Sequence, residues 1–461
     1  MFWENRCTGV DKNAFAVLEE KTYSYEETFA IADGLFSSCE RGVALLLCSR
    51  NLETVVGYVG SLRKKLVPLL IDNCTRIESL NHYTDVYKPR YIFLPSAKAF
   101  LEGYEIKATF LSYVLLERIE DEDIRLDKAL TLLLPTSGST GDPKCVRLSA
   151  KNLDACVSSV CSYLDMGVDR RAVSLLPFHY SYGLSVLNNA MHSRSSIVLS
   201  EASVLERGFW QLLEKKEVTD FSAVPFIYET IKRLKFSEIF LENLVCMTQA
   251  GGPLDPKLTR HFYDVCLANN ISYYTMYGQT EASPRISYVP PDQAMLKLGS
   301  VGIPISCGEA FLAETFQKTG KGELVYKGDN VCLGYSYSKE DLCFGDELNG
   351  VLYTGDQVEI DQDGFIWIVG RRKRFIKVQG LSVNLDHVET VLRQQEPDCV
   401  VIGKENKIIV VHTHRNTTAL EDCIDANFQF HRSNIKLIHE LEIPLNDSGK
   451  IHYVALTKKY L

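Results

Sequence analysis

The chain is organised around Leu134-Pro135-Thr136-Ser137-Gly138-Ser139-Thr140-Gly141-Asp142-Pro143-Lys144-Cys145-Val146-Arg147, where an apolar run meets glycines, hydroxyl side chains and a lysine. Glycines let a backbone turn tightly and bring its N–H groups near an anion, and hydroxyl groups add hydrogen-bond donors. The stretch is not a Walker A motif, in which the lysine follows a glycine and precedes Ser or Thr. Composition alone therefore leaves two interpretations open, a phosphate-binding loop and an ordinary flexible loop.

Length and composition indicate a large globular protein. At 461 residues the chain exceeds what one hydrophobic core usually supports, so two or more domains are expected. The net charge of -9 argues against a nucleic-acid partner, because phosphate backbones need a basic surface. The 14 cysteines form no C-x-x-C pair, which indicates reduced thiols. With no secretory signal and no apolar run of membrane-spanning length in the sequence, we expect a cytoplasmic protein without membrane insertion.

Hydrophobic periodicity predicts alternating strands and helices, the pattern of parallel sheets covered by helices. Ser24 and Glu27 form a capping-box pattern at the start of the first helix. An amphipathic helix is expected at 52–66, and further helices are expected at 203–217 and 255–269. Strands are expected at 43–48, 67–71, 91–94, 173–176, 197–199, 221–224, 244–247 and 271–275.

The character of the chain changes from about Gly299, where segments become shorter and richer in glycine. This change predicts a small β-rich subdomain that includes the segment from Gly322 to Tyr335. Beyond Arg374 the pattern indicates a compact α+β unit, with Asn384 as the cap of a helix and a strand from Lys407 to His412.

The stretch Thr136–Lys144 resembles the phosphate loop of the adenylate-forming superfamily, which includes acyl-CoA synthetases, aryl-acid ligases, adenylation domains of peptide synthetases, and luciferases. Further motifs follow in the order typical of that family. The resemblance implies an α/β fold whose large N-terminal domain has αβ-layered subdomains and a small β-rich subdomain, followed by a small mobile α+β C-terminal domain. We expect the N-terminal domain at 1–372 and the C-terminal domain at 373–461.

The resemblance assigns ATP and Mg²⁺ to three motifs. The phosphate loop would use Ser137, Gly138, Ser139, Thr140, Gly141 and Lys144. In Tyr277-Gly278-Gln279-Thr280-Glu281, Tyr277 would stack on adenine, Thr280 would touch phosphate, and Glu281 would ligate Mg²⁺, which prefers oxygen ligands. The segment Gln249-Ala250-Gly251-Gly252 would approach the base, although, taken alone, it is better explained as a plain turn between a strand and a helix. Cys145 replaces the usual glycine after the loop lysine, which suggests a stiffer loop or an oxidisable site.

Three later motifs complete the resemblance. Asp356 would accept hydrogen bonds from the ribose hydroxyls, and Arg371 would also reach the ribose. Lys373 would be the hinge residue, and Lys377 with Gly380 would lie in the loop used for the second half-reaction. Lys450 would be the catalytic lysine that reaches across the interdomain cleft. Arg372 and Arg374 are interpreted as an ordinary solvated basic run.

The segment Pro177-Phe178-His179-Tyr180-Ser181-Tyr182-Gly183-Leu184 resembles the place where acyl- and aryl-activating members hold a histidine near the substrate carboxylate. We therefore include His179 among the catalytic residues, with Lys450, Lys144 and Thr280. Members that activate α-amino acids usually have an aspartate at the position of Gly183, where it pairs with the ammonium group. Because an unpaired buried ammonium is costly, Gly183 favours an acid without an α-amino group.

These expectations describe an ATP-dependent acid–thiol ligase, closest in style to stand-alone acyl- or aryl-acid ligases. It would convert a small carboxylic acid to acyl-AMP and pyrophosphate, then transfer the acyl group to coenzyme A or to the phosphopantetheine of a carrier protein. The alternatives are an amino-acid-activating carrier-protein ligase, a catalytically silent nucleotide-binding regulatory module, and a luciferase-type oxygenase. The identity of the acid, the choice of acceptor and the oligomeric state stay open.

Overall fold

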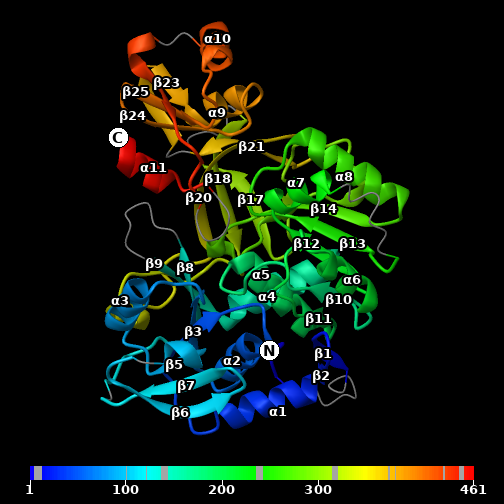
Figure 1. Ribbon diagram of the computed structural model, residues 1–461, viewed down its shortest axis with the longest axis vertical. Coiled ribbons are helices and arrows are strands. Elements are labelled where there is room, and N and C mark those ends of the chain that lie inside the picture. The colour runs from blue at the N-terminus through cyan, green and yellow to red at the C-terminus, as the bar shows by residue number, and fades with distance from the viewer. Residues whose placement is uncertain are drawn as a thin grey trace. The chain divides into compact units, whose positions relative to one another are not determined.

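The computed structural model describes residues 1–4, 13–99, 101–120, 122–136, 144–234, 242–313, 320–371, 374–378, 381–428, 431–445 and 451–461. They form two compact units, each described here by itself. The described part of unit 1 falls within Met1–Gly138, Asp142–Glu309 and Lys327–Leu352, and that of unit 2 within Ala310–Tyr326 and Tyr353–Leu461 (Figure 1). The expected boundary between 372 and 373 lies outside the described residues and stays a prediction.

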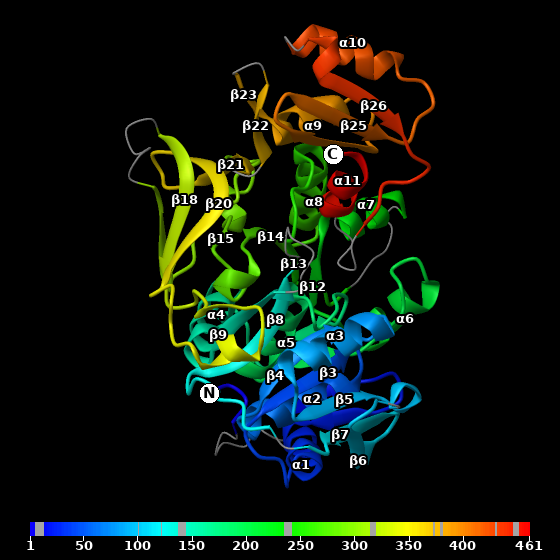
Figure 2. The ribbon, with the colours of Figure 1, turned by 90° about the vertical axis from the view of Figure 1, so that its left-hand side faces the viewer.

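One large sheet of unit 1 is built from eight strands in the order β19-β9-β8-β4-β3-β5-β7-β6 (Figure 2). Its centre is parallel, because β3 pairs in parallel with β4 and β5, and β4 pairs in parallel with β8. The strands are β3 (Val43–Cys48), β4 (Val67–Asp72), β5 (Tyr91–Pro95), β6 (Tyr104–Phe110), β7 (Tyr113–Arg118), β8 (Leu130–Thr136), β9 (Lys144–Ser149) and β19 (Gly334–Ser336). The antiparallel strands β9 and β19 extend the sheet on one side, and the β6–β7 hairpin extends it on the other.

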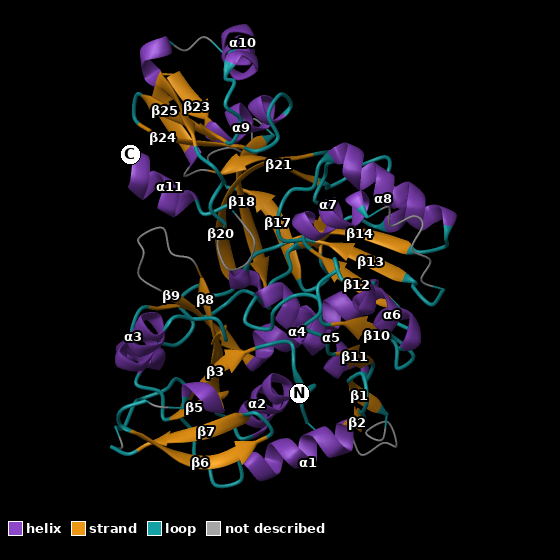
Figure 3. Ribbon diagram, viewed as in Figure 1, coloured by secondary structure: helices purple, strands orange, loops and turns teal. Residues whose placement is uncertain are grey.

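The second large sheet of unit 1 has nine strands in the order β16-β15-β14-β13-β12-β10-β11-β1-β2 (Figure 3). Its strands are β1 (Ala14–Val17), β2 (Thr22–Ser24), β10 (Arg171–Val173), β11 (Ser196–Val198), β12 (Asp220–Ala223), β13 (Cys246–Gln249), β14 (Ser272–Tyr277), β15 (Ser287–Tyr288) and β16 (Ile303–Pro304). The run from β14 to β1 is parallel. Parallel strands are buried on both faces, and β11 (Ser-Ile-Val), β12 and β13 are indeed buried at all or nearly all positions, although polar residues such as Asp220, Thr248 and Gln249 are among them.

Helices divide unit 1 into five layers. The helices are α1 (Tyr25–Leu35), α2 (Leu52–Arg63), α3 (Ile77–Tyr87), α4 (Ala150–Tyr163), α5 (Ser181–Ser193), α6 (Arg207–Lys215), α7 (Pro225–Arg233) and α8 (Pro256–Ala268). One core joins α1, α2, α4 and α5 to the inner faces of both sheets. Separate cores join α3 to the eight-stranded sheet and join α6, α7 and α8 to the nine-stranded sheet.

The strand β3 shows how the sequence produces this layering. Ala44, Leu46 and Cys48 belong to the central core, whereas Val43, Leu45 and Leu47 belong to the core on the other face. Successive side chains of a strand point to opposite faces, so a strand between two helix layers needs apolar residues at every position.

Unit 2 carries most of a four-stranded sheet in the order β17-β18-β20-β21, a two-stranded hairpin, and a three-stranded sheet in the order β24-β25-β26. The strands are β17 (Gly308–Leu312), β18 (Lys321–Gly328), β20 (Val351–Ile360), β21 (Ile366–Arg371), β22 (Phe375–Val378), β23 (Leu381–Asn384), β24 (Cys399–Lys404), β25 (Lys407–His412) and β26 (Ile435–His439). The helices are α9 (Leu385–Arg393), α10 (Thr418–Asn427) and α11 (Tyr453–Tyr460). Helices α9 and α10 pack in one core with β24 and β25, and α11 packs on the other face of these strands.

The sequence predictions of fold class and of several element starts are confirmed. Ser24 caps α1 in a capping box with Glu27, Asn384 caps α9, and β25 spans Lys407–His412. Two details were wrong. β19, which contains Tyr335, joins the eight-stranded sheet rather than a β-rich subdomain. The helix α2 is buried on nearly all sides instead of amphipathic, because it lies in the central layer.

Arg147 on β9 is fully buried and ties several segments of unit 1 together. Its Nε donates to the carbonyl of Tyr335 (2.9 Å), and its Nη1 donates to the carbonyls of Phe344 and Gly345. Its Nη2 donates to the carboxylate of Glu347. A buried cation thus satisfies carbonyl groups that would otherwise be unpaired.

We predict that Arg147→Gln lowers the free energy of unfolding by about 1–3 kcal/mol, because the shorter amide loses most hydrogen bonds of the buried guanidinium, while the exposed Glu347 can turn to water. Urea unfolding followed by circular dichroism measures the change. Arg233→Gln is the matched control, since Arg233 is exposed on α7 and its loss should change stability by less than about 0.5 kcal/mol. Equal stability of the two variants would contradict the structural role of Arg147.

Candidate active site

The side chains of Lys144 and Glu281 both meet Tyr335 in unit 1. Lys144 begins β9, and its ammonium lies 3.7 Å from the centre of the Tyr335 ring. The Tyr335 hydroxyl donates to Oε1 of Glu281 at 2.9 Å. Burial raises the pKa of Tyr335, and the Glu281 carboxylate raises it further, so this hydroxyl keeps its proton at neutral pH. One tyrosine therefore joins the predicted phosphate-binding lysine and the predicted metal ligand.

The chain from Tyr277 to Arg285 forms the loop that carries Glu281. Gly278 faces the backbone of Pro284 and Arg285 so closely that a Cβ there would collide with the Pro284 carbonyl. The buried amide of Asn330 donates to the carbonyls of Ala282 and Arg285, both at 2.7 Å. The glycine of the motif is thus required by the fold of this loop.

Glu281 offers oxygen chemistry suited to Mg²⁺. Its Oε1 accepts the Tyr335 hydrogen bond, while Oε2 makes no hydrogen bond with any described residue. The described residues hold no group of three or more His, Cys, Asp or Glu side chains that could bind a metal ion by themselves. A single carboxylate fits Mg²⁺ held jointly with substrate phosphates and water, the usual coordination of this ion.

The segment containing His179 lies against the same loop. Thr280 Oγ1 donates to Ser181 Oγ at 3.1 Å, and Ser181 is the first residue of α5. The Nε2 of His179 lies 3.9 Å from Oδ2 of Asp72, at the end of β4, and both side chains are largely buried. The predicted histidine, threonine and glutamate are therefore brought to one region of unit 1.

Gly183 has a packing role that the sequence interpretation did not include. A Cβ at this position would collide with the carbonyl oxygens of Leu176 and Pro177. The close approach of α5 to the preceding loop explains the glycine without reference to any substrate.

The segment Gln249–Gly252 follows β13 as a turn. Gln249 is buried, and its Nε2 donates to the carbonyl of Gly252 at 2.9 Å. Gly251 has φ +91°, and a Cβ there would lie 2.6 Å from the Tyr180 hydroxyl. Ala250 is buried beside it. The contact of the segment Gln249–Gly252 with the adenine base stays a prediction, and so do the nucleotide-binding roles of Tyr277 and Gln279.

In unit 2, Asp356 and Arg371 face each other across the antiparallel pair β20–β21. The Nε of Arg371 donates to Oδ1 of Asp356 at 3.1 Å, and the Asp356 side chain is 7% exposed whereas that of Arg371 is 71% exposed. The two predicted ribose-binding residues therefore lie side by side. Lys377 is exposed on β22.

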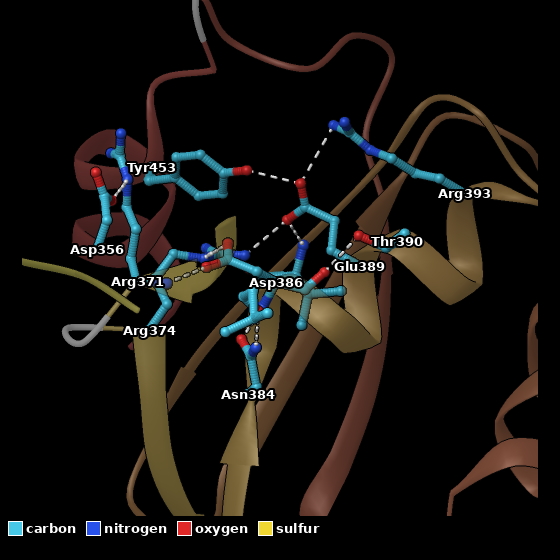
Figure 4. A network of polar contacts seen from close by, with 11 residues as sticks. Asp356, Arg371, Arg374, Asn384, Asp386, Glu389, Thr390, Arg393 and Tyr453 are labelled. Atoms are coloured by element: carbon cyan, nitrogen blue, oxygen red, sulfur yellow. Dashed lines mark hydrogen bonds and ion pairs between the residues drawn. The ribbon is translucent and has the colours of Figure 1, made fainter. Parts of the chain in front are cut away.

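Arg374 is not a solvated basic residue as predicted, because it is the centre of a polar network in unit 2 (Figure 4). Its guanidinium pairs with Asp386 and, at 2.9 Å, with Glu389, and it lies 4.3 Å from the centre of the Tyr453 ring. The Tyr453 hydroxyl donates to the other oxygen of Glu389 at 2.6 Å. The side chain of Arg374 is only 14% exposed. Helix α9 supplies both carboxylates that balance its charge.

Several predicted residues lie outside the described residues. They are Ser137, Gly138, Ser139, Thr140 and Gly141 of the phosphate loop, the hinge residue Lys373, Gly380 and the terminal Lys450. Their assignments stay predictions.

Cys145 is fully buried in β9, and burial raises the pKa of its thiol to about 12. A buried neutral thiol is a poor target for oxidation, so the suggested oxidisable site is wrong.

Sequence patterns assign no role to Asp72, Tyr335 or Arg285, which the structure places beside the predicted site residues. Each carries a weak signal. Asp72 is a carboxylate at the end of a buried strand, Tyr335 follows Gly334 in a family-like motif, and Arg285 is a lone cation among small and apolar residues. None of these signals names a partner.

The sequence is similar to a known protein family and to individual enzymes. The family model described as AMP-binding enzyme matches residues 3–336. The 2-succinylbenzoate–CoA ligase of Bacillus cytotoxicus is 31% identical over 298 residues, which cover 62% of this chain and 59% of that enzyme. The ligase of the same name from Geobacillus sp. is 29% identical over 272 residues, covering 58% of this chain and 54% of that enzyme. The chain thus spans less than two thirds of the length of these relatives.

Solved structures share the fold along nearly the whole chain. The o-succinylbenzoate CoA synthetase (MenE) of Bacillus subtilis, in complex with an acyl-adenylate intermediate, has a TM-score of 0.76 at 21% identity and covers 96% of this chain and 95% of that one. ATP-bound MatB from Rhodopseudomonas palustris has a TM-score of 0.77 at 19% identity, and the match covers 98% of this chain and 97% of that one. At these identities the likeness shows the fold alone.

No helix in the described part of the chain is long and apolar enough to cross a membrane. The order of the sequence motifs, the layered fold and the family match over residues 3–336 all point to the same family. The chain belongs to the AMP-binding enzyme family, within the adenylate-forming superfamily that its sequence motifs resemble.

Proposed function

We propose that this chain is an ATP-dependent acid–thiol ligase that forms acyl-AMP and pyrophosphate and then transfers the acyl group to the thiol of coenzyme A. The contact of Lys144 and Glu281 with Tyr335 carries the proposal, because it holds a cation for phosphate beside a carboxylate for Mg²⁺. Coenzyme A is favoured as the acceptor because the relatives are named CoA ligases. A carrier protein as the alternative acceptor and a cytoplasmic location stay predictions from the sequence.

In the first half-reaction, an oxygen of the substrate carboxylate attacks the α-phosphorus of ATP, and the bond to the β,γ-pyrophosphate breaks. Both reactants are anions, so the protein must neutralise charge and hold the two in line. Lys144 would neutralise phosphate charge, and Thr280 would orient a phosphate oxygen by its hydroxyl. When bound at Glu281, Mg²⁺ would neutralise phosphate charge as a hard cation. His179 would lie beside the attacking carboxylate.

In the second half-reaction, the thiolate of coenzyme A attacks the acyl carbon, and AMP leaves with both electrons of the broken anhydride bond. Asp356 and Arg371 would hold the ribose of the nucleotide throughout, since a carboxylate can accept hydrogen bonds from two hydroxyls. The terminal Lys450 would serve the first step only, and rotation of the C-terminal domain about Lys373 would bring Lys377 and Gly380 to the second.

Isotope exchange between pyrophosphate and ATP tests the proposal. We expect exchange that depends on one class of acid in a panel of aryl, short-chain, hydroxy and amino acids, and that stops when EDTA removes Mg²⁺. Preferred exchange with an α-amino acid would favour the amino-acid-activating alternative. Binding of ATP without exchange for any acid would favour a regulatory module.

We predict that Glu281→Gln lowers the exchange rate at least about hundredfold at moderate Mg²⁺, because the neutral amide is a weaker ligand for a hard cation. The exposed Glu214 of α6 supplies the control Glu214→Gln, which should leave exchange unchanged. An unchanged rate in Glu281→Gln over a range of Mg²⁺ concentrations would exclude Glu281 as a metal ligand.

We also predict that Lys450→Ala slows acyl-AMP formation by about 10²–10³-fold, as expected when one preorganised charge is removed from a developing anion. Thioester formation from supplied acyl-AMP should continue at the rate of the unchanged enzyme. Rapid quenching and chromatography of each half-reaction measures both rates. Equal loss of the two steps would contradict this division of labour.

A further inference from the structure

Three arginines of unit 1 are at most 2% exposed among the described residues: Arg147, Arg194 and Arg285. Arg147 is bonded to carbonyls and to Glu347, and the guanidinium of Arg194 donates to the carbonyls of Phe2, Glu4 and Met191. Arg285 differs from both. None of the three guanidinium nitrogens of Arg285 makes a hydrogen bond or ion pair with any residue that the structure describes.

The neighbours of Arg285 cannot supply the missing negative charge. Its guanidinium lies 4.9 Å from the centre of the Tyr182 ring. Burial raises the pKa of Tyr182, although the nearby cation of Arg285 opposes the rise, and burial raises the pKa values of Tyr180 and Cys156 to about 12. All three groups are therefore neutral at pH 7. Contact with a ring face offsets only part of the cost of burying a cation.

The fold holds Arg285 rigidly next to the predicted reaction site. Asn330 binds its carbonyl, and Gly278 packs against its Cα. Arg285 lies four residues after Glu281 on the same loop. Its ring partner, Tyr182, follows Ser181, which accepts the hydrogen bond of Thr280, and the Tyr182 hydroxyl is bonded to Thr248 at the end of β13.

We propose that Arg285 binds a second carboxylate of the acid substrate, so that the enzyme adenylates one carboxyl group of a dicarboxylic acid while the other pairs with the guanidinium. This inference rests on the proposed acid-activating function and names its substrate class. A planar guanidinium can bind a carboxylate through two parallel hydrogen bonds, and burial strengthens such a pair. The pairing supplies the anion that the described residues lack. The same cation repels an ammonium group, so it disfavours α-amino acids.

Matched pairs of acids that differ by one carboxyl group test the assignment: benzoate with phthalate, propanoate with succinate, and 4-oxo-4-phenylbutanoate with 2-succinylbenzoate. The measured quantity is the ratio of kcat/KM for the two members of a pair in pyrophosphate exchange. Because both values come from one preparation, a partly unfolded variant does not change the ratio. We expect the wild type to favour the dicarboxylic member of at least one pair by about tenfold or more.

In Arg285→Gln this preference should fall at least about tenfold, whereas Arg285→Lys should keep part of it because the charge remains. The control Arg260→Gln removes an exposed arginine of α8 and should leave the ratio unchanged. An unchanged ratio in Arg285→Gln, or an equal fall for every acid, would overturn the proposal and leave Arg285 a structural partner of Tyr182. A rise in the KM of ATP alone would assign the guanidinium to a phosphate and would also overturn it.

Binding measured by calorimetry in the presence of ATP separates this inference from the proposed function, because it needs no turnover. The dicarboxylic member should bind the wild type more tightly than its partner and should lose that advantage in Arg285→Gln. If exchange fails for every acid while this difference in binding persists, the ligase proposal fails and the carboxylate site stands. If none of the dicarboxylic acids binds better than its partner, the carboxylate site fails.

Discussion

The close approach of two backbone segments, at Gly278 and at Pro284–Arg285, is the constraint on which the site of unit 1 depends. The loop between them can return on itself only because residue 278 has no Cβ. Asn330 then fixes the returning end by binding the carbonyls of Ala282 and Arg285. The loop is therefore preorganised by bonds within the protein. Its side chains reach two elements of the unit: Thr280 and Arg285 meet Ser181 and Tyr182 at the start of α5, and Glu281 meets Tyr335 of β19.

Local patterns in the sequence predicted the layered fold well, and nonlocal contacts were beyond them. The strand β3 was predictable because its six residues are apolar on both faces, and the caps Ser24 and Asn384 were predictable because they act within three residues. The place of β19 was not, since its pairing with β9 joins residues almost 200 positions apart. The site shows the same division. Motifs indicated Lys144, Thr280 and Glu281, but the contacts through Tyr335 and Asp72 depend on which strands end side by side.

Gly183 illustrates how one residue can support two explanations. Compared with amino-acid-activating relatives, a glycine here means that no aspartate awaits an ammonium group. In the structure, the carbonyls of Leu176 and Pro177 already exclude any side chain at this position. Packing is thus a sufficient reason for the glycine, and it weakens the argument from the missing aspartate. The stronger physical argument against an α-amino acid comes from Arg285, because a buried cation without an anion among the described residues repels a second cation.

Tyr335 keeps the charges of Lys144 and Glu281 available. A direct ion pair between an ammonium and a carboxylate would occupy the groups that phosphate and Mg²⁺ need, and no such pair joins these two residues in the described part of the chain. Instead the ring face of Tyr335 contacts the ammonium, and its hydroxyl occupies one oxygen of the carboxylate. A ring face takes none of the three N–H donors in a strong hydrogen bond, so Lys144 can still bind an anion. The register that pairs Tyr335 with Val146, two residues after Lys144, creates this arrangement, and Arg147 secures it by binding the Tyr335 carbonyl. Strand pairing at the edge of the eight-stranded sheet thereby sets the electrostatics of the site.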